Sequence, residues 1–520
     1  MPQKTLDALY SVCRKTFDTN YQQLRQTDDP KLKLVDALYC EICANTISLC
    51  VELTCDLTDS PSMETSCRSI LEAIILLRMV FREELDQEQI ANFEKQSALL
   101  FYGNIFDTAK EEEDELFDKN EAESMKKKIE WIVSDCEGAL EAYRKKYGDK
   151  FDERASRNAI REGLFFSRKN PAKGKSFTNL FNSHMSDVDP KGLMYKRVSF
   201  FAHPWYLSDI DDLAWLREER FKDVARCLEL VQELFADELE NASSSDGAIE
   251  HDLDALGVHL KRSQAIESIC SDLSQRSPTS ESEVSFSSLC FAFLRDLLTE
   301  MNIMNGLGFP EMALSKFQSI AEFWAMNAIL NNADGQKKYA ALHRAFDYST
   351  RVQIRNLGGF DELGLKEDRV LKNALESAFD NPSISFEDYK ANISKNSLLF
   401  LKGEPVESAP SFLDIVRQGV EIVFPPDRIN KRKGFVLSYL FSIDVHHATG
   451  FCYTENRDCW LYLSHLGLAR TYESIWFFVW LMTLPPNEDP TVKSHLESLI
   501  ELINDENQEI VNLNLKYPEC

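Results

Sequence analysis

The sequence SCRSILE at residues 66–72 begins a long apolar segment, and a related sequence, KFQSIAE, begins another at residues 316–322, 250 positions later. In each segment apolar residues recur every three or four positions, which is the spacing of one face of an α-helix. The pattern predicts helices over 66–81 and 313–330. We therefore expect one helical plan that the chain uses twice.

The two copies differ in the polar residues that they keep. Arg68 of the first copy is replaced by Gln318 in the second. A histidine follows the glutamate of each copy, His203 after 131 residues and His446 after 124. A duplicated domain that loses a charged group in one half is typical of one working half and one supporting half, so we expect the chemistry in the first copy.

Length and patterning predict several helical domains. A chain of 520 residues is too long for one hydrophobic core. Polar sequence over 241–285, with a short helix within 248–272, predicts a linker between a helical domain at 1–240 and a degenerate second helical domain at 286–520. An amphipathic pattern over 209–239 and the scarcity of alternating patterns predict an all-α fold. We expect two tandem helical bundles related by an approximate two-fold axis.

Charge and cysteine content narrow the class of protein. The chain has 85 acidic and 58 basic residues and a net charge of -27, so any site for a polyanion must be a local basic patch. The N-terminus lacks the apolar core of a signal peptide, and the longest apolar run, 475–482, is far shorter than a membrane span. Thirteen cysteines in such a chain indicate reduced thiols. We expect an acidic, cytoplasmic protein that binds no membrane.

Arg68 and Glu72 lie one helical turn apart and therefore share a face of the first predicted helix. On a solvated surface such a pair contributes only about 0.2–0.5 kcal/mol. Their neighbours in the apolar run indicate a mostly buried helix, where a charge is costly unless it meets a partner. The pair is either architectural or part of a site, and the sequence leaves both interpretations open.

A second polar group lies on a predicted helix that ends at His203. Lys196, Ser199 and His203 share one face, and Pro204 disfavours helical conformation at the histidine. At the C-terminal end of a helix the dipole favours a protonated imidazole, which suits a proton carrier near neutral pH. The alternative is a histidine that caps or packs the helix end.

The spacing Arg197-x5-His203 resembles the Arg-x(4–6)-His signature of the HEPN superfamily, small helical domains that include metal-independent ribonucleases. The block at Arg68, followed at a distance by a tyrosine-containing helix that ends in His-Pro, is more similar to an uncharacterised family of bacterial helical domains grouped near HEPN. The resemblance covers about 35–240, with a weaker echo over about 287–484. The proline after His203 departs from what active HEPN ribonucleases usually show.

This resemblance implies cleavage of RNA by its own 2′-hydroxyl, with His203 moving a proton and Arg197 holding the phosphate. Arg68 and Glu72 complete the implied catalytic set. Family members usually build the site between two domains of a dimer, which pseudo-dimeric halves of one chain, or a homodimer, would supply. Leu440 and Phe441 stand near the place of Arg197 in the second copy, and Gln318 replaces Arg68, so activity is expected in the first copy alone. Bacterial antiphage defence is the setting that the resemblance suggests.

The charge of the chain reverses between residues 144 and 175, where eleven basic residues stand against four acidic ones. Such a patch favours RNA or another polyanion as partner. The alternative is a solvated helix and loop, or a dock for acidic segments of the same protein. The candidate nucleic-acid contacts are Lys196 and seven residues of this stretch: Arg154, Arg157, Arg161, Arg168, Lys169, Lys173 and Lys175.

No metal or cofactor is expected. Cys40, Cys43 and Cys50 have a spacing that suggests zinc, but they lie on one helical face within an apolar run. Packed core thiols are therefore the favoured interpretation.

Two functional hypotheses stay open. The first is a metal-independent ribonuclease or RNA-binding effector, which requires Arg68, Glu72, Arg197 and His203 to converge on a cleft that solvent reaches. The second is a non-catalytic helical adaptor or scaffold that binds a protein or nucleotide through its duplicated domains. It requires the same residues to be satisfied in the core.

Overall fold

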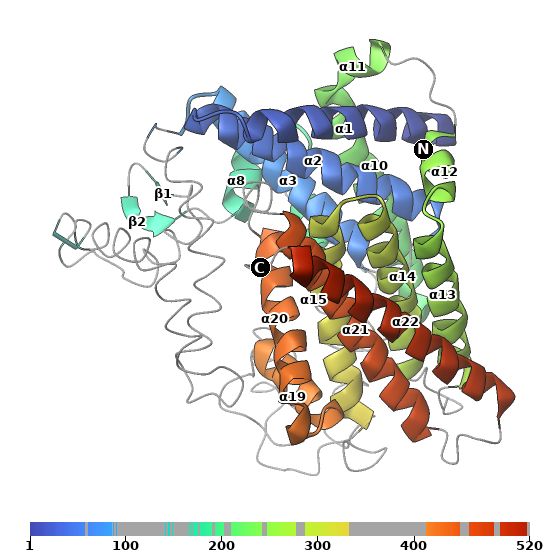
Figure 1. Cartoon of the computed structure of the whole chain (residues 1–520). Helices are drawn as coiled ribbons and strands as arrows, with labels where there is room; N and C mark the ends of the chain where they lie inside the picture. Colours follow the sequence, from blue (N-terminus) through green and yellow to red (C-terminus); the bar gives the residue numbers. More distant parts are fainter. Residues whose placement is uncertain are drawn as a thin grey trace, which may run out of the picture.

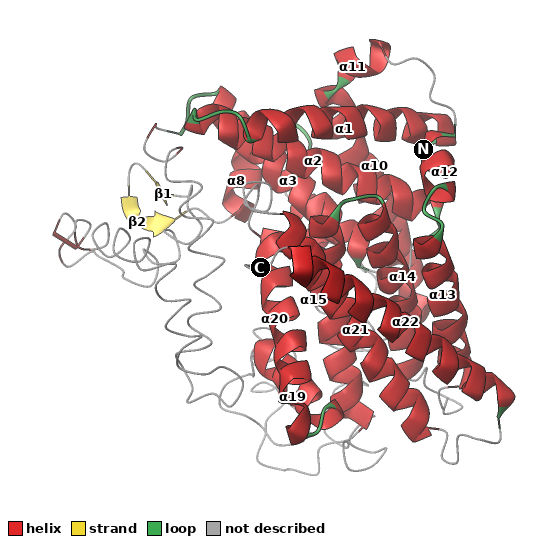
Figure 2. Ribbon diagram, in the orientation of Figure 1, coloured by secondary structure: helices red, strands yellow, loops and turns green. Residues whose placement is uncertain are grey.

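The computed structural model describes residues 1–57, 61–85, 177–189, 193–201, 210–241, 247–276, 286–331, 412–447, 457–482 and 489–516, with short pieces between 87 and 174. Helices make up almost all of this part (Figure 2). The strands within it form one short antiparallel ribbon, β1 (Phe166–Ser167) with β2 (Asn170–Gly174). The predicted all-α fold is confirmed.

The N-terminal half, as we use the term, consists of the helices up to residue 241. They are α1 (Gln3–Leu24), α2 (Pro30–Thr54), α3 (Ser62–Phe81), α8 (Phe177–His184), α9 (Leu193–Phe201), α10 (Ile210–Leu234) and α11 (Ala236–Asn241). Helix α2 packs against both α1 and α3, and α3 also contacts α8, α9 and α10. Contacts on so many sides explain why nearly all of α3 is buried.

The C-terminal half begins with α13 and surrounds α15 in a similar way. Its elements are α13 (Val258–Arg276), α14 (Phe286–Gly306), α15 (Pro310–Asn331), α19 (Phe412–Val423), η3 (Pro426–Arg428), α20 (Ile429–His447), α21 (Arg457–Met482) and α22 (Pro490–Lys516). Helix α15 contacts α14, α19, α20 and α21. The helices predicted over 66–81 and 313–330 are therefore the central helices α3 and α15.

The polar region predicted as a linker contains two helices in its described part, α12 (Ala248–Asp254) and α13. The carboxylate of Asp7 accepts the backbone N–H groups of Gly247 and Ile249, each at 3.1 Å, and so caps α12. Tyr10 also donates its hydroxyl to Asp252 at 2.8 Å. These contacts hold α12 on α1, while α13 packs on α14.

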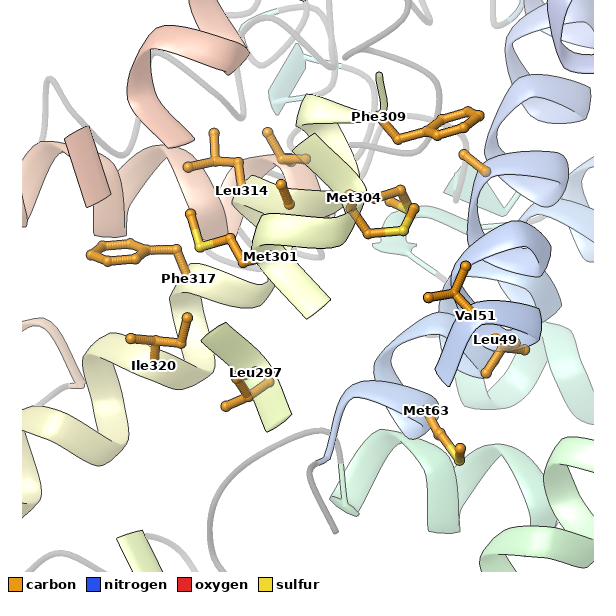
Figure 3. Packing of buried hydrophobic residues seen from close by; sticks show 14 of the residues in the cluster. Leu49, Val51, Met63, Leu297, Met301, Met304, Phe309, Leu314, Phe317 and Ile320 are labelled. Carbon is orange, nitrogen blue, oxygen red and sulfur yellow. The ribbon is translucent and has the colours of Figure 1, made fainter. Parts of the chain in front are cut away.

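The two halves meet through apolar side chains. In Figure 1, α1 and α2 run across the upper part of the molecule, above α13, α14 and α21. Leu49, Val51 and Met63 of α2 and α3 lie opposite Met304 and Phe309 at the turn between α14 and α15 (Figure 3). Burial of these apolar side chains is the main stabilising contribution to the contact between the two halves.

Helix α2 is also where the candidate zinc cysteines lie. Cys40, Cys43 and Cys50 are fully buried among its apolar residues, in agreement with the core-thiol interpretation. The helix is long and apolar enough to cross a membrane by length and composition, and 89% of its most apolar window is buried inside the protein.

Candidate polar site on helices α3, α9 and α10

Arg68 and Glu72 form the ion pair that their spacing on α3 predicts. Arg68 Nε donates to Glu72 Oε1 at 3.0 Å. The arginine side chain is 14% exposed and the glutamate side chain 2%, so the pair lies at the edge of the core. Burial lowers the pKa of Arg68, but Glu72 and Tyr195 together outweigh burial and raise that pKa above its ordinary value.

A tyrosine from α9 completes this group. Tyr195 donates its hydroxyl to the same oxygen, Glu72 Oε1, at 2.6 Å. Its ring is buried and stacks on Phe181 of α8. Burial raises the pKa of Tyr195 well above its usual range, so the phenol stays protonated and acts as a donor. Arg68, Glu72 and Tyr195 tie α3 to α9.

Two further ion pairs attach α10 to the same region. Arg197 of α9 donates to both oxygens of Asp223 on α10, at 2.7 and 2.5 Å. One turn earlier on α10, Arg220 donates to Glu64 of α3. Burial raises the pKa of Glu64, the Arg220 charge lowers it, and the Asp223 charge raises it, so neighbouring pairs lie within electrostatic range of each other.

The expected catalytic residues are thus only partly brought together. Arg68 and Glu72 share one cluster, whereas Arg197, on the same helix as Tyr195, is directed to Asp223. The side chain of Arg197 is 15% exposed and that of Asp223 is 8% exposed. His203 lies outside the described residues.

The expected nucleic-acid contacts are mostly beyond the described part of the chain. Lys196 is exposed on α9. Lys173 belongs to β2, and its side chain is not described. Residues that lie outside the described ranges are Arg154, Arg157, Arg161, Arg168, Lys169 and Lys175.

The C-terminal half contains an uncharged form of the Arg68 cluster. Gln318 Nε2 donates to Glu322 Oε1 at 3.1 Å, and Tyr439 of α20 donates its hydroxyl to the same oxygen at 3.1 Å. Burial raises the pKa of Glu322 to about 8. His446, which follows Glu322 by 124 residues, lies in α20, but its side chain is not described.

One residue of each of the other two pairs, Arg197–Asp223 and Arg220–Glu64, also has a neutral residue at the place that matches it in sequence. Phe441 follows Tyr439 by two residues, as Arg197 follows Tyr195, and its ring lies 6.3 Å from that of Trp460. Leu314, 250 positions after Glu64, is fully buried. In each of the three Arg–carboxylate pairs, at least one of the two residues is thus matched in the C-terminal half by an uncharged residue.

The chemistry open to this site is limited by its charge balance. Each of the three arginines faces a carboxylate, so an anionic ligand would compete with Asp223 for Arg197 or with Glu72 for Arg68. Among the described residues no group of three or more His, Cys, Asp or Glu side chains is placed to hold a metal ion.

Sequence reasoning missed Tyr195, Asp223, Arg220 and Glu64. A weak signal existed for the tyrosine, because Tyr195 follows Glu72 by 123 residues and Tyr439 follows Glu322 by 117. Nothing in the sequence singles out Asp223 from the other acidic residues of its helix.

Comparison of the chain with protein-family models, with curated proteins and with solved structures finds no match.

Proposed function

We propose that the chain is a duplicated helical protein whose N-terminal half carries an RNA-directed site, as a metal-independent HEPN-like ribonuclease or RNA-binding effector. One observation carries the proposal. The Glu–Tyr contact between two helices occurs in both halves, but an arginine joins it only at Glu72.

Two helices can pack together as α3 and α9 do without the Arg–carboxylate pairs. Gln318, Phe441 and Leu314 stand at the corresponding places of the C-terminal half, where α15 and α20 still pack together. Replacing buried ion pairs by packed neutral groups is often neutral or stabilising. Three Arg–carboxylate pairs kept in one half therefore favour a role beyond packing.

In the proposed reaction the 2′-oxygen of RNA forms a bond to phosphorus while the bond from phosphorus to the 5′-oxygen breaks. His203 accepts the proton of the 2′-hydroxyl or gives one to the leaving oxygen. Arg197 stabilises the charge that builds on the phosphate, for which it must exchange part of its Asp223 contact for the substrate. The C-terminal half takes the place of the second subunit of a dimer.

The second candidate is a non-catalytic helical scaffold. A specific observation favours it, because Arg68 and Arg197 are already bound to carboxylates and little exposed. In this hypothesis the polar residues fix the packing of α3, α9 and α10, and a partner binds elsewhere.

RNA degradation by purified protein separates the two. The variants are His203→Ala and the double variant His446→Ala with His447→Ala. The second is the matched control because His447 follows Tyr439 by eight residues, as His203 follows Tyr195. We expect loss of about 10²–10⁴-fold in cleavage rate for His203→Ala and little change for the control, with circular dichroism showing intact folding. Cleavage that survives His203→Ala, or its absence with wild-type protein, favours the scaffold.

A further inference from the structure

A fully buried lysine joins the two halves of the molecule. Lys316 of α15 places its Nζ 2.8 Å from Glu300 of α14 and 3.2 Å from Glu52 of α2. The same Nζ donates to Ser62 at 2.5 Å and to Ser66 at 3.2 Å, both on α3. The lysine side chain is 1% exposed and both glutamates 0%. We call these five residues and Ser48, which donates to Glu300 at 2.6 Å, the junction cluster.

The junction cluster is close to charge-neutral. Burial, together with the nearby Glu300 charge, raises the pKa of Glu52 well above its usual range, so Glu52 holds its proton. Burial raises the pKa of Glu300, but the Lys316 ammonium and hydrogen bonds with Glu52, Lys316 and Ser48 together outweigh burial and lower the pKa of that carboxyl. One ammonium and one carboxylate, both fully buried, thus face each other at 2.8 Å.

The helix ends on either side of the junction have the same geometry. Asp56 after α2 and Gly308 after α14 both have positive φ, 55° and 82°. In each turn the next residue donates its backbone N–H to the carbonyl oxygen five residues earlier at 2.9 Å, Leu57 to Glu52 and Phe309 to Met304. Because Asp56 and Gly308 are 252 positions apart, each residue of α2 before the first turn is equivalent to the residue of α14 that lies 252 positions later. Ser48 is therefore equivalent to Glu300.

Beyond the turns the related sequences at 66–72 and 316–322 correspond at a separation of 250, which pairs Ser66 with Lys316. Both of these corresponding pairs are in direct contact, at 2.6 Å for Ser48 with Glu300 and 3.2 Å for Ser66 with Lys316. In an object with two-fold symmetry, only groups beside the axis touch their own equivalents.

We propose that the α2–α3 face and the α14–α15 face are equivalent pairing surfaces that meet about a pseudo-two-fold axis at the junction cluster, and that Lys316 makes each face select the other half. This inference rests on the duplication in the proposed function but not on RNA cleavage. Two C-terminal faces would bring Lys316 against Lys316 and Glu300 against Glu300 in an apolar contact. Two N-terminal faces would bring Ser48 against Ser48 and Ser66 against Ser66, and Glu52 would lack the Lys316 ammonium. Only the mixed pair places the Lys316 ammonium beside glutamates of both halves without bringing like charges together.

Moving the lysine across the axis tests this inference in the full-length protein. Lys316→Ser removes the cation, and the double variant Ser66→Lys with Lys316→Ser restores it from the corresponding position of the other half. Lys493→Ser, at an exposed position of α22, is the matched control for exchanging a lysine for serine in a helix. Melting temperature and mass in solution are measured for each variant.

We expect Lys316→Ser to lower the melting temperature by about 5–10 °C, since removing one partner of a buried ion pair leaves the other uncompensated. The double variant should recover most of this loss, and Lys493→Ser should change little. If Lys316→Ser is insoluble, a soluble double variant supports the inference equally. A double variant no better than Lys316→Ser, or a Lys316→Ser protein as stable as wild type, overturns it. Failure of the ribonuclease assay leaves these outcomes unaffected.

Discussion

Glu322 accepts the hydroxyl of Tyr439 at 3.1 Å, while its other oxygen, Oε2, is buried without a hydrogen-bond partner in the described part of the chain. Glu72 accepts Tyr195 in the same manner but has Arg68 beside it. One glutamate–tyrosine contact is therefore built twice, with a cation and without one. The absence of a cation leaves burial to set the pKa of Glu322 at about 8.

Stability should fall as pH rises from about 4.5 to about 8. Glu322 keeps its proton in the folded protein up to about pH 8, whereas the unfolded chain releases it near the ordinary value of 4.5. The stabilisation is complete below the lower value and is lost as pH rises through the upper one, with a slope that approaches roughly 1.4 kcal/mol per pH unit. Urea unfolding at several pH values within this range measures the slope. Glu322→Gln is neutral at every pH and should remove this component, so an unchanged slope would count against the assignment.

Exchanging Arg68 and Gln318 should exchange this behaviour between the halves. Gln318→Arg places a cation beside Glu322, which lowers the pKa of that carboxyl and weakens the pH slope above neutrality. Arg68→Gln leaves Glu72 buried without its ion-pair partner and should cost about 3 kcal/mol at neutral pH. Unfolding free energies at acid and neutral pH check both variants. An Arg68→Gln loss that is equal at the two pH values would contradict the role of the ion pair.

The partner of Arg197 should be as important for stability as the arginine itself. Asp223→Ala leaves a little-exposed guanidinium without its bidentate carboxylate, and we expect a loss of about 3 kcal/mol in unfolding free energy. Arg226→Ala, at a more exposed position on the same helix, should cost less than about 1 kcal/mol. Chemical denaturation of the two variants gives the comparison. Equal losses would show that Arg197 and Asp223 contribute no more than a surface pair.

Helices and contacts within one helix were predictable from the sequence, whereas contacts between distant helices were not. The helix expected over 66–81 is α3, and the one expected over 209–239 is divided between α10 and α11. Both predictions depend on apolar spacing within one helix. The Arg68–Glu72 bond likewise follows from a four-residue separation.

The partners that the sequence did not identify come from distant segments. Asp223 contacts Arg197 only because α10 packs beside α9. The sequence contains many other acidic residues, and no pattern in it distinguishes Asp223 as the partner of Arg197. Lys316 stands at the start of a recognised repeat, yet its burial depends on two glutamates from different helices in the two halves. Such contacts are set by how helices pack, which apolar periodicity within a single helix does not specify.

Two glycines in the C-terminal half should respond differently to alanine. A Cβ at Gly419 of α19 would lie 2.6 Å from the Cα of Ala325, whereas a Cβ at Gly467 of α21 would lie 2.8 Å from Cδ2 of the Phe317 ring. A backbone atom of a packed helix cannot move without moving α15, but a ring can rotate by a small angle. Gly419→Ala should therefore cost at least about 1–3 kcal/mol, and Gly467→Ala less, because alanine also gains about 0.5–1 kcal/mol of helix preference over glycine.

Shortening the obstructing ring distinguishes this explanation from a general intolerance of the helix to alanine. In a Phe317→Leu background the contact at Gly467 is relieved, so Gly467→Ala should be neutral or stabilising there. The same background should not rescue Gly419→Ala, whose nearest contact is the backbone of Ala325. Thermal unfolding of the single and double variants measures the coupling. Additive effects of Phe317→Leu and Gly467→Ala would mean that the ring does not limit the approach of α21 to α15.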